Sequence, residues 1–494
     1  MKPIVFDTEK YIKLQSSHIQ ERITQFNNKL YMEYGGKLFD DHHAHRILTG
    51  FDPDTKLQML KSMSDIVEIV IAINANDIAN SKLRSDLGIS YEVEVFRLID
   101  AFRAAGLYFG SVVITQFSGQ VQAKAFIERL NRSEIKTYCH YVISDYPTNV
   151  DLIVSDGGYG KNEYVETTRP LVVVTAPGPG SGKMAVCLSQ LYHDYKMNNK
   201  SGYAKFETFP IWNLPIDHPV NLAYEAATAD LNDVNTVDPY HLKAYNTVAA
   251  NYNRDIEAFP ILNAILTKIS GSSPYHSPTD MGVNMIGSCI IDDAGCQENA
   301  KQEIIRRYYK GLIDYRFHNG RQETVNKITA LMERLNITVK DRPVVEAALA
   351  KAELTQTPSM ALELPDGTIV TAKTTSLLGA SAALFLNALK ALAGIPDKQL
   401  LLSPEVIEPI VSMKTNIIGN SNPRLHADEI LIALAISAST NPSAALAMEQ
   451  LPNLKDCEVH STALIPATDE YIFRKFMMNL TCEPHIVAKR LYKK

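Results

Sequence analysis

LVVVTAPGPGSGKMAV, residues 171–186, joins three kinds of sequence that belong to one fold. It opens with an apolar, β-branched run of the kind found in strands that are buried on both faces. A loop with three glycines and two prolines follows, and a helical pattern begins near Lys183. A buried strand that enters a helix through a glycine-rich turn is typical of a parallel α/β sheet.

The residues before this stretch repeat the same alternation. Strand-like apolar runs lie at 65–74, 111–117, 136–144, 150–156 and 170–176, and helical patterns lie at 91–106 and 119–131. Continuously apolar strands separated by helices predict a mostly parallel sheet with helices on both faces. Residues 1–220 are therefore expected to form a doubly wound α/β domain.

Two further domains are expected, because 494 residues are too many for one compact core. Residues 221–345 show helical patterns with few strand signals, which predicts a helical domain. Residues 346–494 open with a hairpin signal in which Pro365-Asp366-Gly367 supplies the turn. A helix expected at 376–394 and a strand at 457–465 complete a smaller α+β domain.

Composition narrows the class of protein. The chain carries 49 basic and 55 acidic residues, a net charge of −6, which argues against a nucleic-acid partner. No stretch approaches the roughly 20 apolar residues of a membrane span, and the N-terminus lacks the apolar region of a secretory signal. The six cysteines form no CxxC pair, so reduced thiols in the cytoplasm are expected. Large apolar helices are compatible with a homodimer.

The glycine loop has the composition of an anion site. Gly178, Gly180 and Gly182 let a ligand approach the backbone closely. The free N–H groups and the dipole of the following helix favour an anion, and Lys183 adds a full positive charge. Ser181 offers a hydroxyl in the same turn. The sequence therefore predicts that this loop binds phosphate.

The nucleotide P-loop pattern fits this loop only in part. Gly182-Lys183 matches its G-K pair, but Pro177 stands where the first glycine belongs. Met184 replaces the Ser or Thr that would hold magnesium. ATP with magnesium is therefore a narrower candidate cofactor than phosphate in general. The alternative is a plain Gly-Pro turn closed by a surface lysine.

A second glycine-rich loop, SDGGYGKNEY at 155–164, follows the strand expected at 150–156. Ligands in open α/β sheets bind outside the carboxyl ends of the strands, where both loops should then meet. Asp156 is accordingly a candidate catalytic or magnesium-binding residue, and Lys161 a candidate phosphate ligand. The alternative is a solvent-exposed turn.

YGGKLFDDHHAHR, residues 34–46, concentrates charged and imidazole groups. Asp41 and His43 are candidates for acid–base chemistry. Neutral imidazoles together with carboxylates are also plausible zinc or iron ligands, but His43 and His45 could both reach a metal only on an extended chain, where they share one face. No metal-ligand set is assigned, and a polar substrate-binding or surface loop is the alternative.

Seven segments together resemble one bacterial family that is catalogued as uncharacterised, with a domain of unknown function. They are YGGKLFDDHHAHR, SDGGYGKN, TAPGPGSGK, KFETFPIWNLP, ATADLNDVN, NYNRD and SPTDMGVN. The resemblance covers nearly the whole chain, and TAPGPGSGK followed by KFETFPIWNLP is its most specific part. It implies a large cytoplasmic protein with an α/β, a helical and a smaller C-terminal domain, and it assigns no reaction.

Three functional hypotheses follow. In the first, the protein is a cytoplasmic enzyme that binds a nucleotide or another phosphorylated small molecule at residues 177–183 and transfers a phosphoryl or other group. In the second, an ATP-independent enzyme uses a metal or acid–base groups, among them Asp41, His43 and the acidic segment 227–238, on a phosphorylated or carboxylated metabolite. In the third, the protein is a non-catalytic scaffold.

Overall fold

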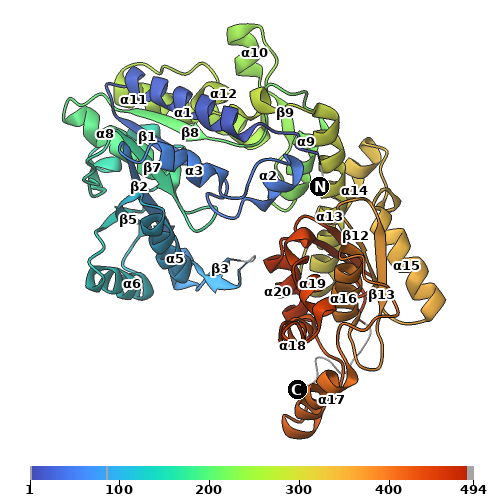
Figure 1. The fold of residues 1–494 in the computed structure, drawn as a ribbon. Coiled ribbons are helices and arrows are strands. Elements are labelled where there is room, and N and C mark those ends of the chain that lie inside the picture. The colour runs from blue at the N-terminus through green and yellow to red at the C-terminus, as the bar shows by residue number, and fades with distance from the viewer. Residues whose placement is uncertain (1–2, 85–86, 487–494) are drawn as a thin grey trace. The chain divides into compact units, whose positions relative to one another are not determined.

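The structure is a computed structural model that describes residues 3–84 and 87–486 (Figure 1). The contacts divide the chain into two compact units. We call Ile4–Glu225 with Asp233–Gln297 the sheet unit. The C-terminal unit consists mainly of Ala226–Asn232 and Glu298–Lys494. The three-domain division drawn from the sequence stays a prediction beside these two units.

The sheet unit is built on a seven-stranded sheet in the order β11-β8-β1-β7-β2-β5-β6. Every neighbouring pair in this sheet is parallel. This confirms the predicted α/β class. The strands are β1 (Leu30–Tyr34), β2 (Val67–Asn74), β5 (Tyr108–Phe117), β6 (Thr137–Tyr141), β7 (Leu171–Thr175), β8 (Gly202–Phe206) and β11 (Gly282–Val283).

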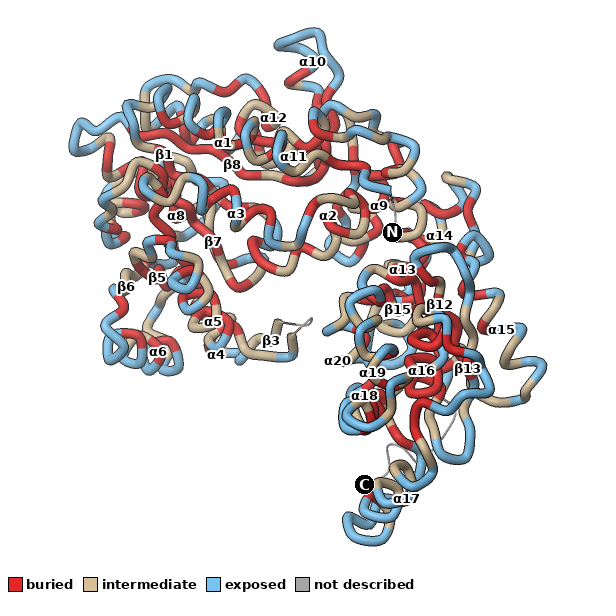
Figure 2. Tube along the Cα trace, viewed as in Figure 1, coloured by how far each residue is buried: buried red, intermediate tan, exposed pale blue. Residues whose placement is uncertain are grey.

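Helices cover both faces of this sheet, as predicted. Side chains alternate along β1: Met32 faces a core shared with α1 (Thr8–Gln25), α3 (Thr55–Ser62), α5 (Tyr91–Ala104) and α6 (Val121–Arg132). Tyr31 faces the opposite core, shared with α8 (Lys183–Lys196) and α11 (Asn253–Ser270). The central strands β2 and β7 are buried along nearly their whole length (Figure 2), which explains their continuously apolar sequences.

The strand expected at 150–156 is wrong. Val150–Ile153 forms the short helix α7, because the Asn149 side chain accepts a hydrogen bond from the Leu152 N–H at 3.1 Å and caps it. Only Ile153 of this helix is buried. A local cap therefore outweighs the β-branched composition, and the loop at 155–164 follows a helix and not a strand.

Shorter elements complete the sheet unit. They are α2 (His42–Ile47), α4 (Ala75–Ala79), β3 (Leu83–Arg84), β4 (Ile89–Ser90), η1 (Tyr159–Lys161), α9 (Pro219–Ala227), β9 (Asn235–Val237), α10 (Pro239–Tyr245), β10 (Ala250–Tyr252), α12 (Pro278–Met281) and η2 (Ile286–Cys289). The last residues of α9 belong to the C-terminal unit. Among the described residues, no helix has both the length and the apolar character needed to cross a membrane.

The C-terminal unit contains a four-stranded mixed sheet in the order β13-β12-β14-β15. The predicted hairpin is confirmed: β12 (Ser359–Glu363) and β13 (Ile369–Lys373) are antiparallel, and Gly367 adopts φ +85° in the turn. The helix expected at 376–394 is α16 (Ala380–Leu392), and β14 (Glu458–Ser461) lies within the expected strand.

The other elements of this unit are helical, apart from one strand. They are α13 (Asp293–Phe317, which begins in the sheet unit), α14 (Gln322–Arg334), η3 (Val339–Asp341), α15 (Pro343–Thr355), α17 (Pro404–Ser412), η4 (Met413–Ile417), α18 (Ala427–Ser437), α19 (Pro442–Met448), η5 (Leu451–Leu454), α20 (Ala467–Lys475) and β15 (Asn479–Cys482). Helix α17 has no buried residue and projects from its unit in Figures 1 and 2.

Candidate functional site

The motif-bearing loops of the sheet unit gather at one edge of the sheet. Because all seven strands are parallel, the segments that follow them share the carboxyl edge. Residues 35–46 follow β1, residues 176–182 follow β7, and the segment beginning at Glu207 follows β8. The chain leaves β1 toward the face of α3 and leaves β7, its neighbour, toward the face of α8. In open α/β sheets, ligands bind where neighbouring strands diverge in this way.

The loop between β7 and α8 requires its glycines. Gly180 and Gly182 adopt φ +77° and +84°, a left-handed region that favours glycine. A Cβ atom on Gly178 would overlap the hydroxyl of Tyr91. The Thr115 hydroxyl donates to the Ser181 carbonyl at 2.8 Å and fixes the loop against β5. The glycines thus serve the backbone shape that the phosphate hypothesis needs.

Backbone donors are concentrated at the start of α8. Gly182 is the N-cap of this 14-residue helix, and no side chain caps it. Within the described part of the chain, the N–H groups of Gly180, Ser181, Gly182 and Lys183 have no hydrogen-bond acceptor. Lys183, the first residue of the helix, is half-buried. Free amides, a helix N-terminus and an ammonium group therefore coincide at one short loop.

The Ser181 hydroxyl has a different partner from the expected ligand. It donates to the Gly178 carbonyl at 2.8 Å, and Ser181 is fully buried. In this structure Ser181 therefore stabilises the turn, while its N–H group is among the free donors. A ligand contact from its hydroxyl stays a prediction.

Asp156 and Lys161 lie near the opposite end of α8. Asp156 accepts a hydrogen bond from Tyr192 at 2.7 Å and pairs with Lys196 at 2.5 Å. Those partners follow Lys183 by nine and thirteen residues, which is about 14 Å and about 20 Å along the helix. Lys161 is exposed and follows Gly160, which lies against Asp156. The structure thus does not bring the two glycine-rich loops together, and the ligand roles of Asp156 and Lys161 stay predictions.

Asp41 has a structural task at the start of α2. Its side chain accepts a hydrogen bond from the Ala44 N–H at 3.2 Å and pairs with Lys56 at 2.6 Å. Burial would raise the pKa of Asp41, but the Lys56 ammonium outweighs burial and lowers it. The carboxylate is therefore held in its charged form as a helix cap.

His43 belongs to a group of stacked rings. Its ring lies edge-on to Phe209 and Tyr224, with centroid distances of 5.2 and 5.3 Å. His43 and His45 both lie on α2, so they do not share the face that an extended chain would give them. Among the residues that the structure describes, no group of three or more His, Cys, Asp or Glu side chains is arranged to hold a metal ion.

A charged cluster that the sequence did not predict as a unit lies at the same carboxyl edge. Lys205 of β8 pairs with Glu207 at 2.7 Å and with Asp255 of α11. Glu33 of β1 is in register with Lys205 and accepts a hydrogen bond from Tyr203 at 2.8 Å. We call Glu33, Lys205, Glu207 and Asp255 the Lys205 cluster. The sequence feature that could have revealed it is KFE at the start of KFETFPIWNLP, in which Lys205 and Glu207 are two residues apart at the end of a short apolar strand.

The charges in this cluster shift one another's pKa values. Burial would lower the pKa of Lys205, but Asp255, Glu207 and Glu33 raise it above its usual range. Burial raises the pKa of Glu207 to about 7, while Lys205 opposes that shift. The Lys205 cluster therefore contains an ammonium group and a carboxyl group that titrates near neutral pH.

Comparison with known proteins places the chain in a family. Residues 4–336 match "Domain of unknown function DUF1846, N-terminal", and residues 340–492 match "Domain of unknown function DUF1846, C-terminal". The chain belongs to the DUF1846 family. The resemblance expected from the seven segments is confirmed at this level.

Relatives of this DUF1846 chain match it along its whole length. A "UPF0371 protein" of Streptococcus sanguinis (strain SK36) is 55% identical over 494 residues, all of both chains. The "UPF0371 protein M28_Spy1076" of Streptococcus pyogenes serotype M28 (strain MGAS6180) is 54% identical over the same length and coverage. The family is uncharacterised, so the site's chemistry must be argued from its residues.

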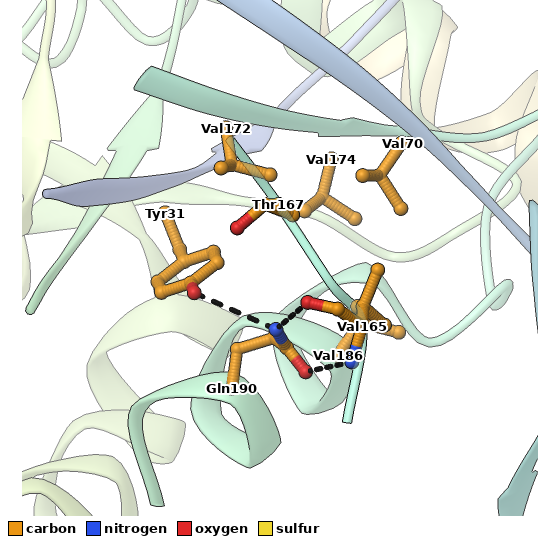
Figure 3. Close-up of a pocket in the computed structure, with 8 residues that line it drawn as sticks. All are labelled: Tyr31, Val70, Val165, Thr167, Val172, Val174, Val186 and Gln190. Carbon is orange, nitrogen blue, oxygen red and sulfur yellow. Dashed lines mark hydrogen bonds between the residues drawn. The ribbon is translucent and has the colours of Figure 1, made fainter. Parts of the chain in front are cut away.

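One internal space in this DUF1846 chain lies beneath α8 (Figure 3). It is lined by Tyr31, Val70, Val165, Thr167, Val172, Val174, Val186 and Gln190, and it is too small to admit a water molecule. The Gln190 amide donates to the Val165 carbonyl at 2.8 Å and accepts from the Val165 N–H at 2.9 Å. This space is a packing gap in the core behind the site, and its polar groups bind one another.

Proposed function

We propose that the protein is an enzyme that binds a phosphorylated small molecule at the 177–183 loop and transfers a phosphoryl or other group. One observation carries the proposal: the backbone N–H groups of Gly180 to Lys183 have no acceptor within residues 3–84 and 87–486, and they stand at the N-terminus of α8. Such donors, with a lysine beside them, are the recurring elements of phosphate sites.

The position of the loop supports the same reading. It follows β7, which lies between β1 and β2 in the sheet, and ligands of open α/β sheets bind at such divergence points. Fixed donors that face a phosphate stabilise the negative charge that develops during group transfer. ATP with magnesium is a more specific candidate ligand. Met184 replaces the hydroxyl that usually binds magnesium, so ATP has less support than phosphate in general.

The test measures binding of inorganic phosphate, and of ATP with and without magnesium, by isothermal titration calorimetry. Lys183→Ala should weaken phosphate binding at least about 10-fold, because a charge-assisted hydrogen bond contributes roughly 1.5–3 kcal/mol. The melting temperature without ligand should stay unchanged. The matched control is Lys200→Ala, which removes an exposed lysine beyond the C-terminal end of α8.

Two results would overturn the proposal. One is that the wild-type protein does not bind inorganic phosphate or ATP. The other is that Lys183→Ala and Lys200→Ala bind them as the wild type does, which would leave the scaffold hypothesis.

We further propose a cytoplasmic location. All six cysteines are free thiols, and five of them are buried. Free thiols are typical of proteins in reducing compartments. Homodimer formation and the absence of a nucleic-acid partner stay predictions.

A further inference from the structure

The Lys205 cluster lies on the face of the sheet toward which the 177–183 loop leads. Glu33 is in register with Val174 of β7 on one side and with Lys205 of β8 on the other. Residues paired in this way point to the same face, here the face covered by α8 and α11. Strands in a sheet are about 4.8 Å apart, so the row from β7 to Lys205 spans about 10 Å.

The pKa of Cys187 depends on a charge from the 177–183 loop and on a charge from the Lys205 cluster. Cys187, one turn after Lys183 on α8, is fully buried, and burial is the main cause of its raised pKa. Glu33 raises that pKa further, whereas Lys183 lowers it. Glu33, a member of the Lys205 cluster, and Lys183 of the loop therefore both act on the same residue of α8.

A buried hydroxyl beside the Lys205 cluster has no partner. Tyr252 is 5% exposed, and among the described residues its hydroxyl forms no hydrogen bond. Tyr252 is the N-cap residue of α11, whose first turn carries Asp255 of the cluster. Burial raises the pKa of Tyr252, and Tyr224, Glu207, Asp233 and Asp255 raise it further. A buried hydroxyl without a hydrogen-bond partner destabilises the folded protein. The Thr208 hydroxyl, next to Glu207, is 6% exposed and is likewise without a partner in the described chain.

The hydrogen-bond donors and acceptors of the Lys205 cluster and Tyr252 indicate which kind of ligand group they could bind. Three carboxyl groups surround one ammonium group, so the cluster does not favour a second anion. It offers acceptors on Glu33 and Asp255 and donors on Lys205 and Tyr252. A neutral group that both donates and accepts, such as a sugar hydroxyl, satisfies both kinds of partner.

We propose that the ligand of this protein is a phosphorylated sugar, whose phosphate binds at residues 177–183 and whose hydroxyl groups bind the Lys205 cluster and the Tyr252 hydroxyl. This inference rests on the proposed function, because it needs the phosphate at the loop. It adds the class of ligand, a sugar phosphate, and the residues that would recognise the sugar.

The experiment compares inorganic phosphate, ribose 5-phosphate and glucose 6-phosphate by calorimetry on the full-length protein. At least one sugar phosphate should bind the wild type 10-fold or more tightly than phosphate does. Tyr252→Phe should reduce that preference about 3- to 10-fold, the effect of one lost hydrogen bond, and leave phosphate affinity unchanged. Its melting temperature should be equal or higher, because an unpaired buried hydroxyl is removed.

The matched control is Tyr34→Phe. Tyr34 is also buried with an unpartnered hydroxyl within the described chain, but it faces the opposite core. This variant should keep the full sugar-phosphate preference.

The outcomes separate the two proposals. If phosphate binds through Lys183 but neither sugar phosphate binds more tightly than phosphate, the sugar inference is overturned and the proposed function stands. Equal losses in Tyr252→Phe and Tyr34→Phe have the same meaning. If the wild type binds none of the three probes, the sugar inference is overturned, and the proposed function is overturned with it when ATP does not bind either.

Discussion

Two buried charge clusters, one in each unit, show how differently the same residue types can be used. In the C-terminal unit, Arg306 and Arg342 share the carboxylate of Glu458, and Arg306 also pairs with Glu303 at 2.8 Å. Arg307 also pairs with Glu303, at 2.9 Å, so each of these two carboxylates contacts two arginines. In the sheet unit, the Lys205 cluster sets one ammonium against three carboxyl groups and leaves the Tyr252 hydroxyl unpaired among the described residues.

In the C-terminal cluster, the guanidinium donors of Arg342 bind acceptors within the protein. Arg342 is fully buried, and it donates to the carbonyls of Val459 and Asn479 at 3.1 and 2.7 Å and to the Thr481 hydroxyl at 3.2 Å. Such a network stabilises β14 and β15. The difference teaches that burial of charge alone does not mark a ligand site. The Lys205 cluster differs in having an excess of carboxyl groups and, among the described residues, an unpaired hydroxyl beside them at the sheet's carboxyl edge.

The largest effect is expected from Arg342→Ala. It leaves the buried Glu458 with one arginine and exposes three acceptors to an apolar gap, so it should destabilise the C-terminal unit by about 3–5 kcal/mol. Urea denaturation followed by circular dichroism measures this loss. The control Arg334→Ala, at an exposed position on α14, should change stability by no more than about 0.5 kcal/mol. A loss below about 1 kcal/mol in Arg342→Ala would mean that the network is not structural.

A smaller, pH-dependent effect is expected from Glu207→Gln. The folded pKa of Glu207 is about 7, above its usual value of 4.5. The bound proton therefore stabilises the folded state fully below about pH 4.5, and this contribution is lost as the pH rises through about 7. The wild type should lose no more than about 3 kcal/mol in this window, and the variant, which cannot ionise there, should not.

Melting curves of the wild type and Glu207→Gln between pH 4.5 and 8 test this sign. The stability of the variant relative to the wild type should increase with pH. Parallel curves, or a relative stability that decreases with pH, would show that Glu207 is an ordinary ionised partner of Lys205. The contrast between the two clusters would then disappear.

The smallest effect is expected from Asp156→Asn. The Asp156 side chain is 82% exposed, and its pair with Lys196 lies in water, where such pairs contribute little. Melting temperature and phosphate affinity should both stay at the wild-type values. A clear loss of phosphate binding would bring the loop at 155–164 back into the site and would contradict the placement at the far end of α8.

The composition of the apolar runs predicted most strands of the sheet correctly. It did not predict correctly that the loops at 155–164 and 177–183 lie together. The runs at 65–74, 111–117 and 170–176 are buried on both faces, and their β-branched sequences predicted β2, β5 and β7. The run at 150–156 has the same composition, but the Asn149 cap turns it into α7. Asp156 was misplaced for that reason.

The candidate site was predictable only where it is continuous in sequence. The β7–α8 loop carries its glycines, lysine and helix start in one stretch, and the structure places it at the carboxyl edge. The Lys205 cluster is assembled from β1, β8 and α11, whose neighbourhood depends on the strand order. Asp41 shows the converse, because its motif suggested chemistry and its carboxylate serves as a helix cap.

The most direct test of the central claim is a crystal structure of the protein grown with inorganic phosphate. The account predicts an anion within about 3 Å of the N–H groups of Gly180, Ser181, Gly182 and Lys183, with the Lys183 ammonium beside it. A structure in which phosphate binds elsewhere, or in which side chains of the protein occupy those four N–H groups, would contradict it.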